Sequence, residues 1–194
     1  MKWLSIVKSW PLRARRSWRD LLAHTGGVAA IEFALVIPLV IIVYAGGFEI
    51  VQAATVNRKL TDTTVQLANV TSQYTAVADT DVNNIFGASS QIMVPYSTTP
   101  LTIVLSEVVT DASSNATVCW SKSYPSTVTP LVTGSAITMP AGMASPHSHY
   151  ILVQTTYAYT PTIGGAFMSG LPMANQVFMI PRASTQIPYD GITC

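Results

Sequence analysis

The longest apolar run in the chain extends from Val28 to Phe48, and Glu32 is its only charged residue. A helix of roughly 20 apolar residues crosses a bilayer core of about 30 Å, so this run is long enough to span a membrane. A charged side chain inside such a span costs about 2.5 to 3.5 kcal/mol on insertion scales. The pattern therefore predicts a transmembrane helix over residues 28–48 in which Glu32 requires a partner.

The helical pattern continues beyond the apolar run, because no glycine or proline interrupts the chain between Phe48 and Tyr74. Apolar and small residues recur there at steps of three and four, which marks one face of a helix. This predicted face consists of Ala53, Val56, Leu60, Thr63, Leu67, Val70 and Tyr74. We interpret it as the face against which the following domain packs. The helix is expected to extend from Val28 to about Ala76, and Pro38 is expected to bend it within the membrane.

After residue 78 the chain alternates between strand-like segments and turns. Four segments have the β-branched, alternating texture of strands, namely 101–109, 116–122, 150–159 and 176–180. A short helix is expected over 82–90 with Asp81 as its N-cap. Residues 125–140 are expected to form a long connection, and residues 161–175 a loop or a short helix. The predicted fold class is α+β, a long N-terminal helix followed by a mostly antiparallel sheet of about four strands.

Charge is distributed unevenly, although the net charge is only +1. Residues 1–27 contain six basic residues and one acid, whereas the remainder contains four basic residues and eight acids. Positive charge before a span holds that end of the chain in the cytoplasm, so the residues after Phe48 are expected on the outer side of the membrane.

The two cysteines, Cys119 and Cys194, both fall in the part expected outside, where oxidising conditions let disulfides persist. Two cysteines permit only one intramolecular bridge. A bridge between them would close a loop of about 75 residues, which contributes on the order of 4 kcal/mol to the free energy of unfolding in the chain-entropy model. We expect a disulfide that pins the C-terminal tail, with two unpaired buried thiols as the alternative.

The stretch from Gly26 to Pro38 reads GGVAAIEFALVIP, and it resembles the N-terminal segment of the TadE/TadF-type minor pseudopilins of the Tad (Flp) pilus system. In that family a prepilin peptidase cuts after the glycine, and the glutamate five residues on serves processing and assembly. The resemblance implies a cut after Gly27, a new α-amino group on Val28, and a role for Glu32 in charge pairing with that amine. The pairing can lie within one chain, since the two residues are one helical turn apart, or between neighbouring subunits.

The resemblance also implies a pilin-like layout and a location in the bacterial inner membrane. Its expected domains are a cleaved, basic cytoplasmic leader (1–27), a transmembrane helix (28–48), a periplasmic extension of that helix (49–78) and a periplasmic β-rich domain (79–194). Its expected partners are the inner membrane, the prepilin peptidase, and other pilins and pilus assembly proteins, in a pilus that serves adhesion. No cofactor, nucleic acid or small-molecule substrate is expected.

Two other interpretations of the apolar run remain open. The first is an uncut single-pass anchor that presents a periplasmic binding or adhesion domain. The second is a secretory signal peptide with Val51-Gln52-Ala53 as its small-residue cleavage site, although its apolar core is longer than the usual 7 to 15 residues and contains a glutamate.

The only candidate for chemistry is the pair His147 and His149. Alternate residues of a strand point to the same side, so both imidazoles could bind one metal ion. No Asp or Glu lies within 35 residues of the pair along the sequence, and neither a nucleophile motif nor a phosphate-binding glycine loop occurs. We therefore expect a polar turn before the third strand, no metal site and no enzyme activity.

Overall fold

The computed structural model describes residues 26–163 and 170–194, so most of the expected leader lies outside the described residues. The described residues form two helices and five strands. The chain divides between Phe48 and Glu49 into two compact units. The fold class is α+β, as the sequence predicted.

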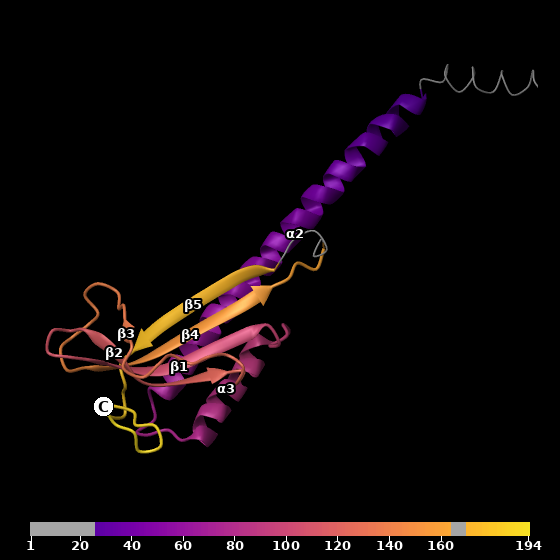
Figure 1. Cartoon of the computed structure of the whole chain (residues 1–194). Helices are drawn as coiled ribbons and strands as arrows, with labels where there is room; N and C mark the ends of the chain where they lie inside the picture. The colour runs from indigo at the N-terminus through magenta and orange to yellow at the C-terminus, as the bar shows by residue number, and fades with distance from the viewer. Residues whose placement is uncertain (1–25, 164–169) are drawn as a thin grey trace, which may run out of the picture. The chain divides into compact units, whose positions relative to one another are not determined.

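Helix α2 extends from Gly26 to Thr71 and contains Pro38 (Figure 1). It ends before the expected Ala76, because the next residues leave the helical hydrogen-bond pattern. The Tyr74 amide donates to the Thr71 carbonyl at 3.1 Å, and the Ser72 carbonyl accepts from the Arg182 amide at 2.8 Å. The C-terminal tail thus satisfies a backbone group at the helix end, which helix termini always require.

Helix α3 extends from Asp79 to Met93, so it is longer at both ends than the helix expected over 82–90. The N-cap is Ala78 rather than Asp81, which corrects the sequence prediction. Asp81 instead occupies the third helical position, where its carboxylate accepts a hydrogen bond from the Ala78 amide at 3.0 Å. This is the returning half of a capping box, and the acids of the first turn also favour the positive end of the helix dipole.

The sheet has the order β3-β2-β1-β4-β5, and every neighbouring pair is antiparallel. Its strands are β1 (Leu101–Thr110), β2 (Ala116–Tyr124), β3 (Ala136–Ile137), β4 (His149–Tyr159) and β5 (Leu171–Met179). The four long strands correspond to the four that the sequence predicted. Two connections were predicted wrongly, because 125–140 contains the two-residue β3 and β5 begins within 161–175. In both segments, hydrogen bonds to a neighbouring strand stabilise a strand that local propensity alone does not predict.

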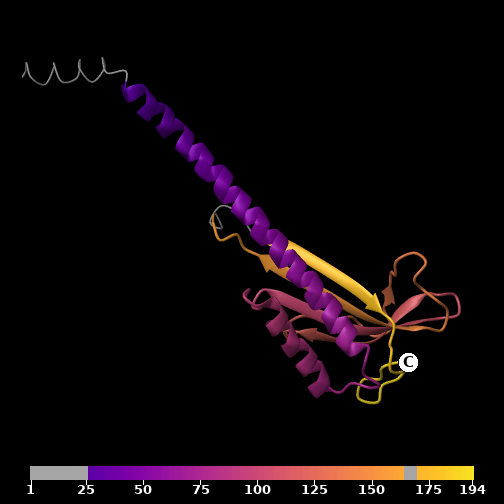
Figure 2. The same ribbon diagram turned by 180° about the vertical axis from the view of Figure 1, so that it is seen from behind.

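The main core lies between one face of the sheet and the part of α2 after Phe48 together with α3 (Figure 2). Its largest fully buried side chains include Leu60 and Leu67 from α2 and Ile103 and Ile151 from the sheet. The predicted face of α2 is largely confirmed. Val70 is an exception, since it lies at the edge of that face and is 37% exposed. The opposite face of the sheet covers a smaller cluster beneath the loops that flank β3, formed by Val108, Ala116, Tyr150 and Leu152.

The expected disulfide is present between Cys119 on β2 and Cys194 in the tail, with Cα atoms 5.8 Å apart. Backbone hydrogen bonds hold the same tail, since Val77 donates to the Pro188 carbonyl at 2.9 Å and Asp190 donates to the Val77 carbonyl at 3.1 Å. The tail is therefore fixed both covalently and by the segment that joins α2 to α3.

Candidate functional site

The apolar part of α2 exposes nearly all of its large side chains. Phe33 is 67% exposed, Leu35 is 74% exposed, and no residue from Val28 to Tyr44 is classed as buried. Among the described residues, α2 is the one helix long and apolar enough to cross a membrane. Each exposed square ångström of apolar surface costs about 25 cal/mol in water, so this surface requires lipid or other protein around it.

Gly27 lies in the first turn of α2, and a Cβ atom added to it would meet no described atom within 4 Å. Glycine inside a helix costs roughly 0.5 to 1 kcal/mol relative to alanine. Neither packing nor backbone conformation therefore explains a glycine at this position.

Val28 and Glu32 lie one turn apart on α2, and both are exposed. Side chains four positions apart on a helix are neighbours on its surface. The two ion pairs found among the described residues, Lys122–Asp79 and His149–Glu107, lie elsewhere. The structure thus places the backbone nitrogen of Val28 on the turn before the Glu32 side chain, and residues 26–163 and 170–194 provide no cation against that carboxylate.

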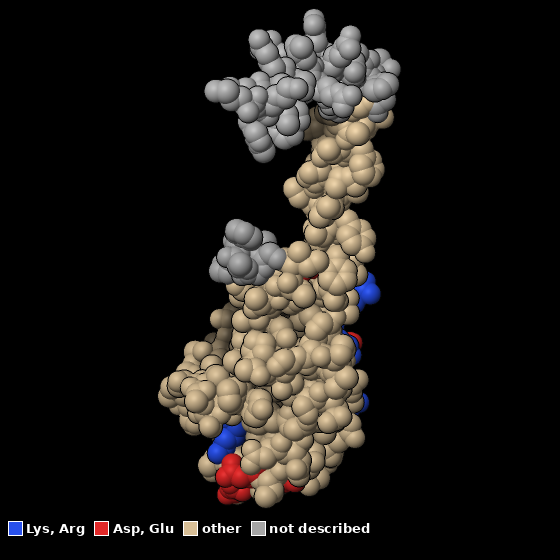
Figure 3. All heavy atoms as spheres, turned by 90° about the vertical axis from the view of Figure 1, so that its right-hand side faces the viewer, with Lys and Arg blue, Asp and Glu red and all other residues tan. Residues whose placement is uncertain are grey.

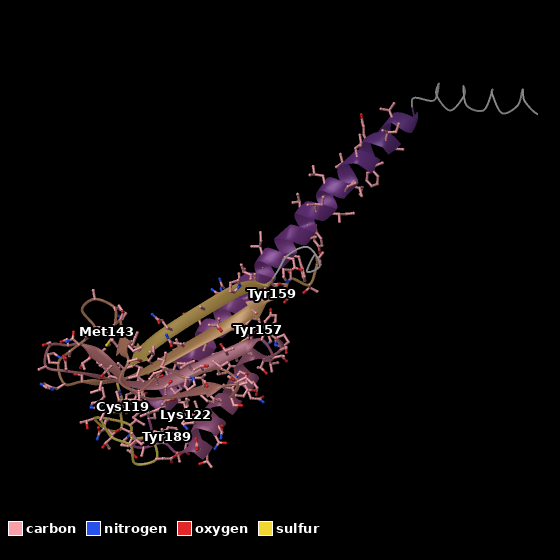
Figure 4. All side chains as sticks on the ribbon, viewed as in Figure 1. Cys119, Lys122, Met143, Tyr157, Tyr159 and Tyr189 are labelled. Carbon is pink, nitrogen blue, oxygen red and sulfur yellow. A yellow bond between two sulfur atoms is a disulfide. The ribbon has the colours of Figure 1, made fainter. Side chains whose placement is uncertain are left out.

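The first residue of the domain after the apolar run, Glu49, is held by two hydrogen bonds. The hydroxyl of Tyr159 donates to one carboxylate oxygen of Glu49 at 2.7 Å, and the Ile163 amide donates to the other. Tyr159 lies at the end of β4, near Tyr157 (Figure 4). Burial and the hydrogen bond to Glu49 raise the pKa of Tyr159 to about 12. The carboxylate therefore joins the end of β4 to the helix at the first residue of the domain.

A buried acid lies at the centre of the sheet, and sequence reasoning missed its role. Glu107 on β1 is 1% exposed, and its carboxylate accepts from the Trp120 indole at 2.9 Å and from the Ile187 amide at 2.8 Å. The Nδ1 atom of His149 lies 3.1 Å from the same carboxylate. Burial raises the pKa of Glu107, and these hydrogen bonds oppose that rise. The sequence signal for this role was the presence of an acid inside the alternating, strand-like segment 101–109.

The histidine pair does not form one site. His149 begins β4 and contacts Glu107, whereas His147 occupies the preceding turn with a φ of 51°. This agrees with the predicted polar turn before the third long strand. Among the described residues, no group of three His, Cys, Asp or Glu side chains is arranged to hold a metal ion.

Comparison with known proteins gives one match. The family model described as TadE-like protein matches residues 27–78, which begin at Gly27 and cover α2 and the link to α3. No curated protein sequence and no solved structure matches the chain. The match contains every residue to which the sequence assigned processing or charge pairing, and it excludes the sheet. Residues 27–78 are therefore similar to the TadE-like family, in agreement with the resemblance drawn from the stretch Gly26 to Pro38.

Proposed function

We propose that the chain is a minor pseudopilin that joins or primes a Tad-type pilus. The observation that carries the proposal is the TadE-like match, which begins at Gly27 and spans the exposed apolar helix with its single acid. In this proposal residues 28–48 cross the inner membrane once. The basic leader remains in the cytoplasm, and the sheet domain lies in the periplasm, where the Cys119–Cys194 disulfide persists.

A prepilin peptidase cuts the chain between Gly27 and Val28. The exposed setting of Gly27 supports this step, because the fold itself makes no use of a missing side chain at that position. A peptidase that closes around the peptide bond does make use of it, since a Cβ would crowd the catalytic pocket. The cut also removes the leader with its six basic residues.

Glu32 then pairs with the new α-amino group of Val28. A carboxylate inside a bilayer is costly unless a cation or hydrogen-bond donor compensates it. Within one chain the amine lies one turn away, and between stacked subunits the amine of a neighbour can take the same place. The second arrangement sets the axial position of one subunit against the next, while the exposed apolar side chains pack against neighbouring helices.

The decisive experiment is the mass of the protein isolated from its native membranes, together with its N-terminal sequence. The proposal expects a chain that begins at Val28, and a chain that begins at Met1 in a strain lacking the peptidase. A native chain that begins at Met1 would favour an uncut anchor that presents a periplasmic binding domain. A native chain that begins near Ala54 would favour an exported protein with a signal peptide. Either result would overturn the proposal.

A further inference from the structure

One end of the domain after Phe48 has exposed apolar side chains and a single charged residue, Glu49. This end, called here the Glu49 end, comprises Glu49, Gln52 and residues 94–100, 158–163 and 170–172. Hydrogen bonds bring its segments together. Tyr96 donates to Gln52 at 3.1 Å, and Tyr157 donates to the Ser97 carbonyl at 3.1 Å.

Three large apolar side chains project from separate segments of the Glu49 end. Val94 is 58% exposed, Ile163 is 50% exposed and Leu171 is 51% exposed. The surrounding sequence contains no Lys, Arg, Asp or Glu between Asp81 and Glu107 or between Lys122 and Arg182. A surface that faces water normally interleaves such apolar residues with charges.

One cluster of charges in the domain lies at the start of α3, away from the Glu49 end. Asp79 at the start of α3 pairs with Lys122 at 3.2 Å and accepts a hydrogen bond from Tyr189, and the ammonium of Lys122 lies 4.2 Å from the Tyr189 ring centre. Figure 3 shows a cluster of acidic and basic side chains at one end of the domain and further basic side chains along one edge, on a face that is otherwise largely uncharged. The nearest cations along α2 are Arg58 and Lys59, which begin about 13 Å beyond Glu49 at 1.5 Å per residue. The ammonium of Lys59 donates to the Ile92 carbonyl at 3.1 Å, so one cation borders the Glu49 end close to Val94.

We propose that the Glu49 end rests on the outer surface of the lipid bilayer, with Val94, Ile163 and Leu171 in the headgroup region. Glu49 directly follows Phe48, the last residue of the apolar run, so no linker separates this surface from the membrane. Its carboxylate does not prevent the contact, because Tyr159 and Ile163 each donate a hydrogen bond to it. The inference relies on the proposed membrane span, and it is independent of cutting at Gly27 and of pilus assembly.

Tryptophan reporters in the full chain test this contact. Replacing Trp3, Trp10 and Trp18 by phenylalanine leaves only the buried Trp120 as background. Ile163→Trp or Leu171→Trp is added, and Val132→Trp, which is 71% exposed on the loop after β2, is the matched control. Each protein is placed at low density in phosphatidylcholine vesicles with brominated acyl chains, which quench tryptophan on contact.

The proposal expects the tryptophan at 163 or 171 to lose roughly half of its emission, as an indole at the headgroup level should, and the tryptophan at 132 to lose almost none. Equal quenching at the three positions, or none at any, overturns it. Quenching or a blue shift at 163 that appears only when the protein density is raised also overturns it, because neighbouring copies would then cover the surface.

A second variant set tests whether the apolar side chains cause the contact. With Val94→Trp as reporter, the double substitution Ile163→Asp and Leu171→Asp should reduce quenching at least twofold, because carboxylates avoid the hydrocarbon boundary. Val132→Asp should leave the quenching unchanged. Unaltered quenching in the double variant overturns the proposal. Extraction of the parent chain by alkaline carbonate would overturn the membrane span as well, whereas a retained chain with a uniform quenching pattern overturns only this inference.

Discussion

The indole of Trp120 on β2 donates a hydrogen bond to the carboxylate of Glu107 on β1 at 2.9 Å, and the same indole lies 2.8 Å from the Ile187 carbonyl. One buried acid therefore connects the centre of the sheet to the C-terminal tail. Since Trp120 is the only tryptophan after residue 18, its fluorescence reports on this connection once the three leader tryptophans are replaced.

Titration of Glu107 should appear in the Trp120 emission with a midpoint above 4.5, the ordinary value for glutamate, because burial raises its pKa. A raised pKa means that the folded state binds the proton more tightly than the unfolded state. The contribution of this group to stability is thus fully present below pH 4.5 and is lost as the pH rises through the folded pKa. Fluorescence between pH 3 and pH 8, about the range in which such a group titrates, measures the transition.

Glu107→Gln should abolish that transition and lower the free energy of unfolding by about 1 to 3 kcal/mol. The carboxylate accepts from both the Trp120 indole and the Ile187 amide, whereas glutamine has one acceptor oxygen, so one of these donors would face an NH2 group. Asp62→Asn, at an exposed position of α2, is the control for loss of one acid. If the transition persists unchanged in Glu107→Gln, a group other than Glu107 causes it.

Reduction of the disulfide should lower the free energy of unfolding by about 2 to 5 kcal/mol, since the bridge between Cys119 and Cys194 closes a sequence separation of 75 residues. Urea unfolding with and without dithiothreitol measures the difference. The Cys119→Ser/Cys194→Ser protein should match the reduced protein and should not respond to dithiothreitol. A response of that double variant to the reductant would contradict the prediction.

Gly27→Val should block removal of the leader in cells that contain the peptidase, because the side chain would crowd the catalytic pocket. Gly47→Val is a matched control, since a Cβ at either glycine of α2 meets no atom within 4 Å. The gel mobility of each variant, compared with a peptidase-deficient strain, gives the result. Cleavage of Gly27→Val at the wild-type rate would show that the glycine has no part in recognition.

Glu32→Ala should still insert into the membrane, where loss of a charge is favourable, but it should not support pili. Glu32→Asp, which keeps the charge on a shorter side chain, should retain part of the function if charge pairing is the requirement. Membrane fractionation measures insertion, and electron microscopy of sheared filaments measures assembly. Normal filaments in the Glu32→Ala strain would remove the charge-pairing role.

Periodicity along the chain predicted the elements that carry strong local signals. The predicted bounds of β1, β2 and β4 lie within two residues of those in the structure, because β-branched residues alternate there with polar ones. The start of β5 was missed, since Pro172, Ala174 and Asn175 have weak strand preference and are held by pairing with β4. The end of α2 was missed because the Ser72 carbonyl, just after the helix, accepts from the Arg182 amide of a tail that is distant in sequence.

The residues of the candidate site also divide into those that the sequence could predict and those that it could not. Gly27, Val28 and Glu32 form a contiguous motif, so the sequence alone was sufficient to select them. The contact of His149 with Glu107 was not predictable, because it depends on the register of β1 against β4 and the two residues are 42 positions apart. Side chains that meet only through strand pairing leave no spacing signal along the chain.

The order of strands has a consequence for the newly made chain. β1 lies in the middle of the sheet between β2, which follows it directly, and β4, which is synthesised only after β3 and its loops. Until β4 reaches the side of the membrane on which the domain folds, one whole edge of β1 lacks its hydrogen-bond partner, and Leu105, which is buried in the complete fold, lacks part of its cover. The newly made polypeptide therefore passes through a stage in which β1 is open to misassembly, and that stage ends only when residues 149–159 arrive.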